Sequence, residues 1–164
     1  MKTLLLMRHG KSSWKDKDLP DHERPLKKKG KKDSEKMAKL MKDKELIPGY
    51  VLSSTAKRAK MTVEEVINQI GYQGEIKYLD VLYQAEPNDY VSVLAEVPDE
   101  VDNVLIVGHN PSLEAFVQIL SNDIESLPTA ALARIDLAIN SWKEMGSNSY
   151  GKLVGLWTPR ELED

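Results

Sequence analysis

Two of the three histidines in this chain stand directly behind its two most apolar segments. His9 follows the first of these segments, with Arg8 immediately before it, and His109 follows the second. A single histidine at the end of a strand is more often a packed or hydrogen-bonded residue than a catalyst. Two such histidines, together with Arg8 and with Arg58 behind a third strand-like segment, indicate an active site.

Arginine and histidine in this pattern suit the transfer of a phosphoryl group. An arginine donates two parallel hydrogen bonds to phosphate oxygens and stays charged at any relevant pH. One such contact at ~4 Å is worth on the order of 4 kcal/mol before desolvation, at an effective dielectric constant of about 20. Two arginines can thus neutralise a phosphate dianion, so we expect neither a metal ion nor a cofactor. A neutral imidazole can attack phosphorus, while a second, protonated histidine donates to an oxygen.

Strand-like and helix-like segments alternate along the chain. Short apolar runs predict strands at residues 3–7, 50–53, 76–79, 103–108, 131–138 and 152–157. Apolar side chains at three- and four-residue intervals predict helices at residues 28–44, 56–70, 89–95 and 111–120. Ser54 and Thr55 are expected to cap the second helix and Asn110 the fourth, while Gly71 should end the second. A turn is expected around residues 146–148.

This alternation predicts an α/β fold. We expect a three-layer sandwich, in which helices cover both faces of a mostly parallel central sheet of about five to six strands. Ligands bind such sheets beyond the carboxyl ends of the strands, near a switch in strand order. Arg8 and His9 should therefore share a crevice with His109.

Length and composition exclude several classes of protein. The 164 residues predict a single domain, 1–164, and the net charge of −3 does not favour nucleic acid as a partner. No apolar run is long enough to span a membrane, and no signal-peptide cleavage site follows the first segment, so we expect a cytoplasmic protein. The chain lacks cysteine, a Gly-x-x-x-x-Gly-Lys loop and a His-x-x-x-His pair, which argues against thiol phosphatases, nucleotide hydrolases and zinc enzymes.

Four motifs in series resemble those of the histidine phosphatase superfamily. They are Arg8-His9-Gly10, Asp21 through Arg24-Pro25-Leu26, Ser53-Ser54 with Arg58-Ala59, and Gly108-His109-Asn110-Pro111. The segment Lys11-Ser12-Ser13-Trp14 resembles that of the short phosphohistidine phosphatases of the SixA type. The resemblance as a whole extends from Met1 to about Leu120. It implies a phosphoglycerate mutase-like fold.

The resemblance also implies roles for individual residues. His9 would be the nucleophile that becomes phosphorylated, and Arg8, Arg58 and His109 would bind the phosphoryl oxygens. Arg24 would be a further substrate-binding residue; the alternative for Arg24 is a salt bridge with an acid such as Asp21. The implied activity is metal-independent hydrolysis of a phosphoryl group through a covalent phosphohistidine intermediate.

The chain departs from the larger members of the family at one position. Many of them use a glutamate in a Leu-x-Glu segment as general acid, and the matching segment here is Leu82-Tyr83-Gln84. A leaving alkoxide needs such an acid, but a phosphorylated imidazole protonated on its other nitrogen leaves as a neutral ring. The departure favours phosphohistidine of a protein as substrate. Asp21, Asp80 and Glu86 remain candidates for a substitute acid.

Two alternative functions stay open. The first is a phosphatase of sugars or other small phosphomonoesters, and the second is a non-catalytic module that binds phosphorylated proteins. The nucleophile His9 argues against the second, because binding alone does not need it. We expect a phosphorylated protein or a small phosphorylated molecule as partner, and a monomer.

Five lysines crowd around Gly30 at the start of a predicted helix. They are Lys27, Lys28, Lys29, Lys31 and Lys32. Charge runs of this kind usually form a solvated face of a helix. The alternative is a docking patch for an acidic protein partner.

Overall fold

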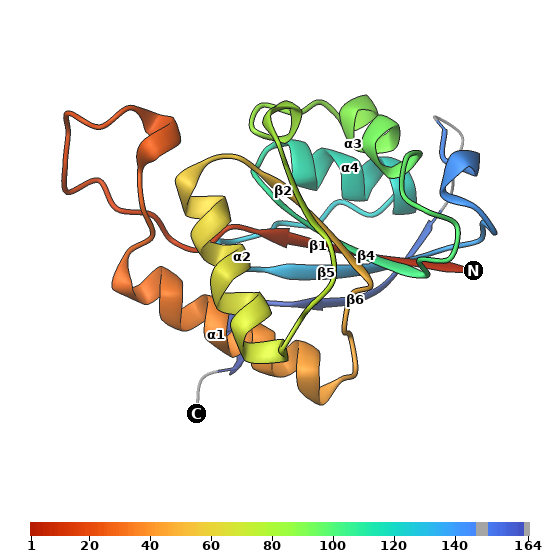
Figure 1. The fold of residues 1–164 in the computed structure, drawn as a ribbon, viewed down its shortest axis with the longest axis horizontal. Helices are drawn as coiled ribbons and strands as arrows, with labels where there is room; N and C mark the ends of the chain where they lie inside the picture. The colour runs from red at the N-terminus through yellow and green to blue at the C-terminus, as the bar shows by residue number, and fades with distance from the viewer. Residues whose placement is uncertain (147–150, 163–164) are drawn as a thin grey trace.

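A six-stranded sheet forms the centre of the molecule, with helices on both of its faces (Figure 1). The computed structural model describes residues 1–146 and 151–162. The strands are β1 (Lys2–Arg8), β2 (Tyr50–Ser54), β3 (Ile76–Leu79), β4 (Asn103–Gly108), β5 (Leu132–Leu137) and β6 (Gly151–Trp157). Their order across the sheet is β3-β2-β4-β1-β5-β6. The predicted α/β sandwich is confirmed.

Four helices cover the sheet, two on each face. They are α1 (Lys28–Asp43), α2 (Lys57–Ile70), α3 (Pro87–Leu94) and α4 (Ser112–Ser121). Side chains of β1 alternate between the faces: Leu5 and Met7 pack with α1 and α2, whereas Leu4 and Leu6 pack with α3 and α4. Because β1 is buried on both faces, its sequence is continuously apolar.

The sheet is mixed, although most of it is parallel as predicted. β1, β4, β2 and β3 run parallel to one another. β5 runs antiparallel to β1, and β6 runs antiparallel to β5. β5 and β6 follow one another along the chain, and an antiparallel pair of strands needs no crossover helix.

The strand order places the ends of three strands side by side. The chain passes from β1 over α1 to β2, and later returns to insert β4 between these two strands. Arg8 at the end of β1 pairs with Gly108 at the end of β4, and Ser53 of β2 pairs with Val107. The segments that follow β1, β2 and β4 therefore emerge at one edge of the sheet.

Two of the predicted helix caps are wrong. The α2 helix begins at Lys57 after Ala56 as N-cap, without a side-chain cap, and α4 begins at Ser112 after Pro111. Gly71 ends α2 in the left-handed conformation, as predicted (φ 68°). The predicted turn after β5 extends to residues 147 and 148, which lie outside the described residues.

Within the described residues, no helix combines the length and apolar character needed to cross a membrane. The longest one, α1, carries lysine and acidic side chains along its exposed face.

Candidate active site

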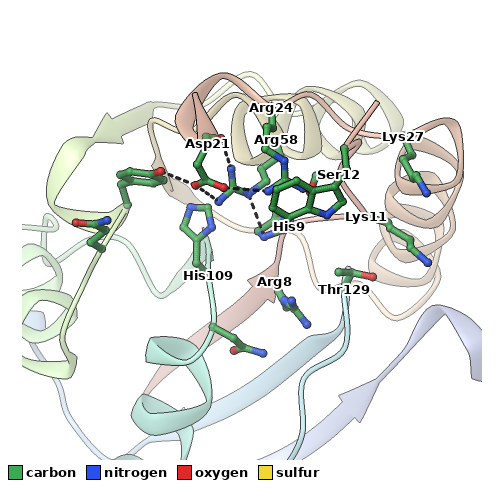
Figure 2. A pocket seen from close by; sticks show the side chains of 14 residues that line it. Arg8, His9, Lys11, Ser12, Asp21, Arg24, Lys27, Arg58, His109 and Thr129 are labelled. Carbon is green, nitrogen blue, oxygen red and sulfur yellow. Dashed lines mark hydrogen bonds and ion pairs between the residues drawn. The ribbon is translucent and has the colours of Figure 1, made fainter. Parts of the chain in front are cut away.

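A pocket of about 430 Å³ lies at the carboxyl ends of β1, β2 and β4. All five residues predicted for the site line it (Figure 2): Arg8, His9, Arg24, Arg58 and His109. The rings of His9 and His109, from segments a hundred residues apart, have centroids 4.9 Å apart. The predicted crevice between the exits of the apolar strands is thus present.

The imidazole of His9 is held in one orientation. Its Nδ1 lies 2.6 Å from the carbonyl oxygen of Gly10. Because a carbonyl only accepts hydrogen bonds, Nδ1 must carry the proton, and Nε2 keeps its lone pair. The guanidinium Nε of Arg58 lies 3.4 Å from that Nε2, a long and weak hydrogen bond. Nε2 is therefore available as a nucleophile.

Both histidines are neutral at neutral pH. Burial lowers the pKa of His9 to about 4, the hydrogen bond to Gly10 opposes this shift, and the positive charges of Arg58 and Arg8 add to it. Burial also lowers the pKa of His109 to about 3, with further lowering by His9 and Arg58. A neutral His9 is the form that can attack an electrophile.

His109 is positioned by the end of β2. Its Nε2 lies 2.8 Å from Oγ of Ser54, which leaves Nδ1 as the nitrogen that could contact a ligand. Ser54 also accepts a hydrogen bond from the backbone N–H of Ala56. The hydroxyl that the sequence predicted as a helix cap thus anchors a histidine of the pocket.

Asp21 holds two of the arginines together. Its carboxylate accepts from Arg58 Nη2 at 3.0 Å and from Arg24 Nη1 at 2.9 Å, and its carbonyl oxygen accepts from Arg58 Nη1 at 2.7 Å. Tyr83 donates its hydroxyl proton to the same carboxylate. Asp21 therefore fixes the positions of both guanidinium groups.

Arg24 forms the predicted salt bridge and also lines the pocket, so the two interpretations of this residue are compatible. Its Nε donates to the carbonyl oxygen of Ser13 at 3.1 Å and its Nη2 to Oγ of Ser12 at 2.7 Å. The ring of Trp14 lies over the guanidinium, with 3.1 Å between its centroid and Cζ. Arg24 connects the loop after β1 to Asp21.

Arg8 is the least satisfied of the arginines. Its Nη1 donates to the carbonyl oxygen of Leu127 at 3.1 Å. Its Nε is buried and has no hydrogen-bond partner within residues 1–146 and 151–162. Burial lowers the pKa of Arg8, the carboxylate of Glu114 opposes this shift, and Arg58 adds to it. The pocket thus contains a buried cationic donor with spare capacity for an anion.

None of the candidate substitute acids can donate a proton to a substrate in the pocket. Asp80 accepts from the hydroxyl of Thr55, and Glu86 forms the capping box of α3; neither lines the pocket. Asp21 is the single carboxylic acid among the described lining residues. The hydrogen bond from Tyr83, followed by those from the two arginines, holds its pKa well below the usual range, so it stays ionised.

Close packing of two glycines fixes the loop that carries His9. A Cβ on Gly10 would lie 2.7 Å from the carbonyl oxygen of Gly30, and a Cβ on Gly30 would collide with the backbone of Lys11. The backbone N–H of Lys27 donates to the carbonyl oxygen of Lys11 at 2.8 Å. Since only glycine permits this approach, the loop after β1 lies directly against the start of α1.

Sequence reasoning missed several parts of the site. Tyr83 was quoted within a motif without a function, and Ser54 and Asn110 were each expected to cap a helix. The side chain of Asn110 donates instead to the carbonyl oxygen of Leu127 at 2.8 Å. The salt bridge of Asp21 with Arg24 was one of the two expected alternatives, whereas the contact of Asp21 with Arg58 leaves no signal in the sequence.

Comparison with known proteins gives consistent matches. The model of the histidine phosphatase superfamily (branch 1) matches residues 4–83. An uncharacterised chloroplast protein of Arabidopsis thaliana is 30% identical over 169 residues, which cover 95% of this chain and 77% of that protein. Both matches include the loop that carries His9.

Solved structures resemble the whole chain. One from Agrobacterium tumefaciens, assigned as the phosphohistidine phosphatase SixA, has a TM-score of 0.83 at 28% identity, covering 96% of this chain and 98% of that one. The protein histidine phosphatase SixA complexed with tungstate has a TM-score of 0.85 at 24% identity and covers 98% and 99% of the two chains; at that identity the likeness is one of fold. With relatives that span nearly its full length, this chain belongs to the histidine phosphatase superfamily and is of the SixA type.

Proposed function

We propose that the protein is a phosphatase that transfers a phosphoryl group from phosphohistidine of a protein to Nε2 of His9 and then to water. The observation that carries this proposal is the orientation of His9. Gly10 holds the ring proton on Nδ1, and Nε2 lies among the cationic groups of the pocket. A nucleophile in this protonation state needs no general base.

In the first step, the lone pair of His9 Nε2 attacks phosphorus. The bond between phosphorus and the substrate nitrogen breaks, and its electron pair stays with the leaving imidazole. That imidazole is already protonated on its other nitrogen, so it departs as a neutral ring. His9 keeps its proton on Nδ1 and becomes the phosphorylated residue.

In the second step, a water molecule attacks the phosphorus of phosphorylated His9. The bond from phosphorus to Nε2 breaks, and both protons of the water leave with the phosphate as the dihydrogen anion. The ring of His9 returns to its starting form, with the proton on Nδ1. No proton has to be supplied to the leaving group in either step, which agrees with a pocket whose single carboxylic acid stays ionised.

The cationic side chains would stabilise the charge on the phosphoryl oxygens. Arg8 lines the pocket with a guanidinium that is only partly hydrogen-bonded, and Arg58 offers the Nε that faces His9. A dianion beside His109 would raise the pKa of this residue, so that it could donate a hydrogen bond. Such preorganised donors are commonly the largest contribution to phosphoryl transfer.

Among the described lining residues no carboxylic acid is placed to act as general acid, which supports phosphohistidine over phosphomonoesters. Gln84 lines the pocket and stands in the segment whose resemblance to Leu-x-Glu implies a glutamate in larger members of the family. Loss of a general acid typically slows the departure of a poor leaving group by about 100-fold or more. Two of the similar solved structures also support this substrate, because they are described as a phosphohistidine phosphatase and a protein histidine phosphatase.

Labelling of the protein tests the proposal directly. With phosphoramidate carrying labelled phosphorus, we expect a phosphate on His9 that is labile in acid and stable in alkali. His9→Ala should abolish both labelling and turnover, whereas the matched variant His22→Ala, which changes a histidine outside the pocket lining, should keep them. A chelator should not change turnover, since arginines supply the positive charge.

Normal turnover by His9→Ala would refute the covalent mechanism. A panel of a phosphohistidine peptide, a phosphoserine peptide and a sugar phosphate tests the substrate. Faster hydrolysis of the sugar phosphate than of the phosphohistidine peptide would favour the small-molecule alternative.

A further inference from the structure

A lysine-rich surface lies beside the pocket, on the loop after β1 and the first turn of α1. We define the lysine surface as the exposed residues Lys11, Lys15, Lys17, Lys27, Lys28 and Lys29. Residues 11–32 contain nine lysines and arginines and four acidic residues, in a chain with a net charge of −3. The region is therefore positive on a protein that is acidic overall. The loop that carries part of it extends from the body of the molecule at the left of Figure 1.

Two hollows connect this surface to the phosphoryl pocket. The first, of about 690 Å³, shares Trp14 and Lys27 with the lining of the pocket. The second, of about 660 Å³, shares Ser13, Lys15 and Pro25 with the first. We call these two adjoining hollows the trough; Asp16 and Asp18 also line the second of them. A small phosphorylated molecule would occupy only the pocket, whereas the trough has room for a chain that continues from the phosphoryl group.

Apart from Lys29, the lysines in the first turn of α1 add no favourable charge interaction to the helix. This turn has no acidic residue, and its N-cap, Lys27, makes no capping hydrogen bond through its side chain. Positive charges at the amino end of a helix oppose its dipole. Lys29 has a partner in Asp33 at 3.1 Å, but within the described part of the chain no acidic side chain pairs with Lys15 or Lys28. Their charges are free for a ligand.

Trp14 provides an apolar contact at the junction of pocket and trough. Its side chain is 69% exposed, although its ring is held over the guanidinium of Arg24. Figure 2 shows Lys11 and Lys27 on the side of the pocket away from His109, so the lysines continue outward from the phosphoryl site. Exposed aromatic residues fixed in this way are common anchors of protein interfaces.

We propose that the lysine surface docks an acidic segment of the phosphorylated protein, next to its phosphorylated residue. This rests on the proposed function and adds the chemistry by which the partner is recognised. Carboxylates of the segment pair with Lys15 and Lys28 along the trough, and an apolar side chain packs on Trp14. The phosphoryl group then enters the pocket toward His9.

Three substrates separate docking from catalysis. They are a phosphohistidine peptide flanked by aspartate and glutamate, the same peptide flanked by asparagine and glutamine, and phosphoramidate. The tested variant is Lys15→Glu with Lys28→Glu, neither of which lines the phosphoryl pocket. The matched control is Lys39→Glu with Lys42→Glu, which makes the same charge change at exposed positions roughly 20 Å along α1.

We expect the unchanged protein to hydrolyse the acidic peptide with about tenfold higher kcat/KM than the amide peptide at low salt. Each exposed ion pair gives about a 1.5- to 5-fold change, so the tested variant should lose most of this preference. The control should keep it, and about 1 M salt should remove it. kcat/KM for phosphoramidate should change less than about twofold in both variants.

Equal hydrolysis of the two peptides by the unchanged protein would overturn the docking proposal while leaving the proposed function intact. The same would follow if the control lost the preference as fully as the tested variant, since overall charge would then be the cause. The preference for the acidic peptide could instead survive in the tested variant and disappear in Lys27→Ala. The cause would then be a second anion site in the pocket, and the docking proposal would again be overturned. Failure to hydrolyse any of the three substrates, with no label on His9, would refute the proposed function itself.

Discussion

Strand β1 carries a cation near each end, buried Lys2 and half-buried Arg8, and the two have different surroundings. Lys2 is 3% exposed, and its Nζ donates to the carbonyl oxygens of Asp99 at 2.6 Å and Val101 at 2.9 Å and pairs with Asp102 at 3.2 Å. Arg8 has one hydrogen bond to a carbonyl oxygen and, within the described residues, a buried Nε without a partner. At the Lys2 end, protein groups satisfy the donors of the cation; at the Arg8 end, a donor remains for a ligand.

The number of hydrogen-bond partners that the fold supplies distinguishes a structural cation from a functional one. Burial of a charge costs free energy unless hydrogen bonds and an opposite charge compensate it. Lys2 is compensated within the fold, so its contribution is to stability. Arg8 is not, so the phosphoryl group is the partner that would complete its surroundings.

The largest expected effect is that of Arg8→Ala on activity. Loss of one donor to the transition state should lower kcat by about 100-fold or more. The free energy of unfolding should change little, because the variant also removes a buried donor without a partner. Steady-state kinetics and chemical denaturation measure the two quantities. A change in kcat of less than about threefold would show that Arg8, like Lys2, is a structural cation without a role in catalysis.

Asp21→Asn tests Arg24 and Arg58, whose charges are compensated less fully than that of Lys2 and more fully than that of Arg8. Arg24 and Arg58 share the carboxylate of Asp21, so they are partly compensated by the fold. Removing its charge should loosen both guanidinium groups and lower kcat by about tenfold. Inorganic phosphate should inhibit more strongly, since the pocket becomes more positive. Unchanged kcat and unchanged inhibition would mean that the carboxylate has no positioning role.

Lys2→Met should affect stability alone. The variant leaves the carbonyl oxygens of Asp99 and Val101 with one donor fewer, which should lower the free energy of unfolding by about 1 kcal/mol. Denaturant titration measures this change, and kcat should equal that of the unchanged protein. A clear loss of kcat would contradict the assignment of Lys2 as a structural cation.

The neutral histidines of the pocket predict a pH dependence of stability. An unfolded histidine titrates near 6.5, whereas the pKa values in the fold are about 4 for His9 and about 3 for His109. Between these values the unfolded chain binds more protons. The free energy of unfolding should therefore fall as the pH is lowered from about 6.5 toward 4.

Denaturation at several pH values measures this slope. Replacement of both His9 and His109 by Asn should flatten it, because the groups with lowered pKa values are then absent. A slope that persists in the double variant would assign it to other residues.

Much of the fold could be read from local patterns. The apolar run before Arg8 predicted β1, and the three- and four-residue spacing of apolar side chains predicted α1 and α2. Such patterns are local, because each strand or helix must bury its own apolar side chains. The antiparallel pairing of β5 was not visible, since strand direction depends on the path of the connecting chain.

The candidate site was predictable in its members but not in its hydrogen bonds. His9, Arg58 and His109 each follow a strand, so the topology of an α/β sheet brought them together. The contacts of Ser54 with His109 and of Asp21 with Arg58 escaped prediction. A short polar side chain near a helix start can cap the helix or bond to a distant residue, and only the three-dimensional arrangement selects between these.

The amino-acid sequence by itself determined which residues are charged, nucleophilic or apolar, and in what order they emerge from the sheet. The tertiary structure decided which nitrogen of His9 carries the proton, which arginines share Asp21, and that the lysines of α1 continue the pocket. The physical reason is the distance along the chain over which each kind of interaction acts. Burial patterns depend on neighbours along the chain, whereas hydrogen bonds and pKa values depend on atoms a few ångströms away in space, whatever their separation in sequence.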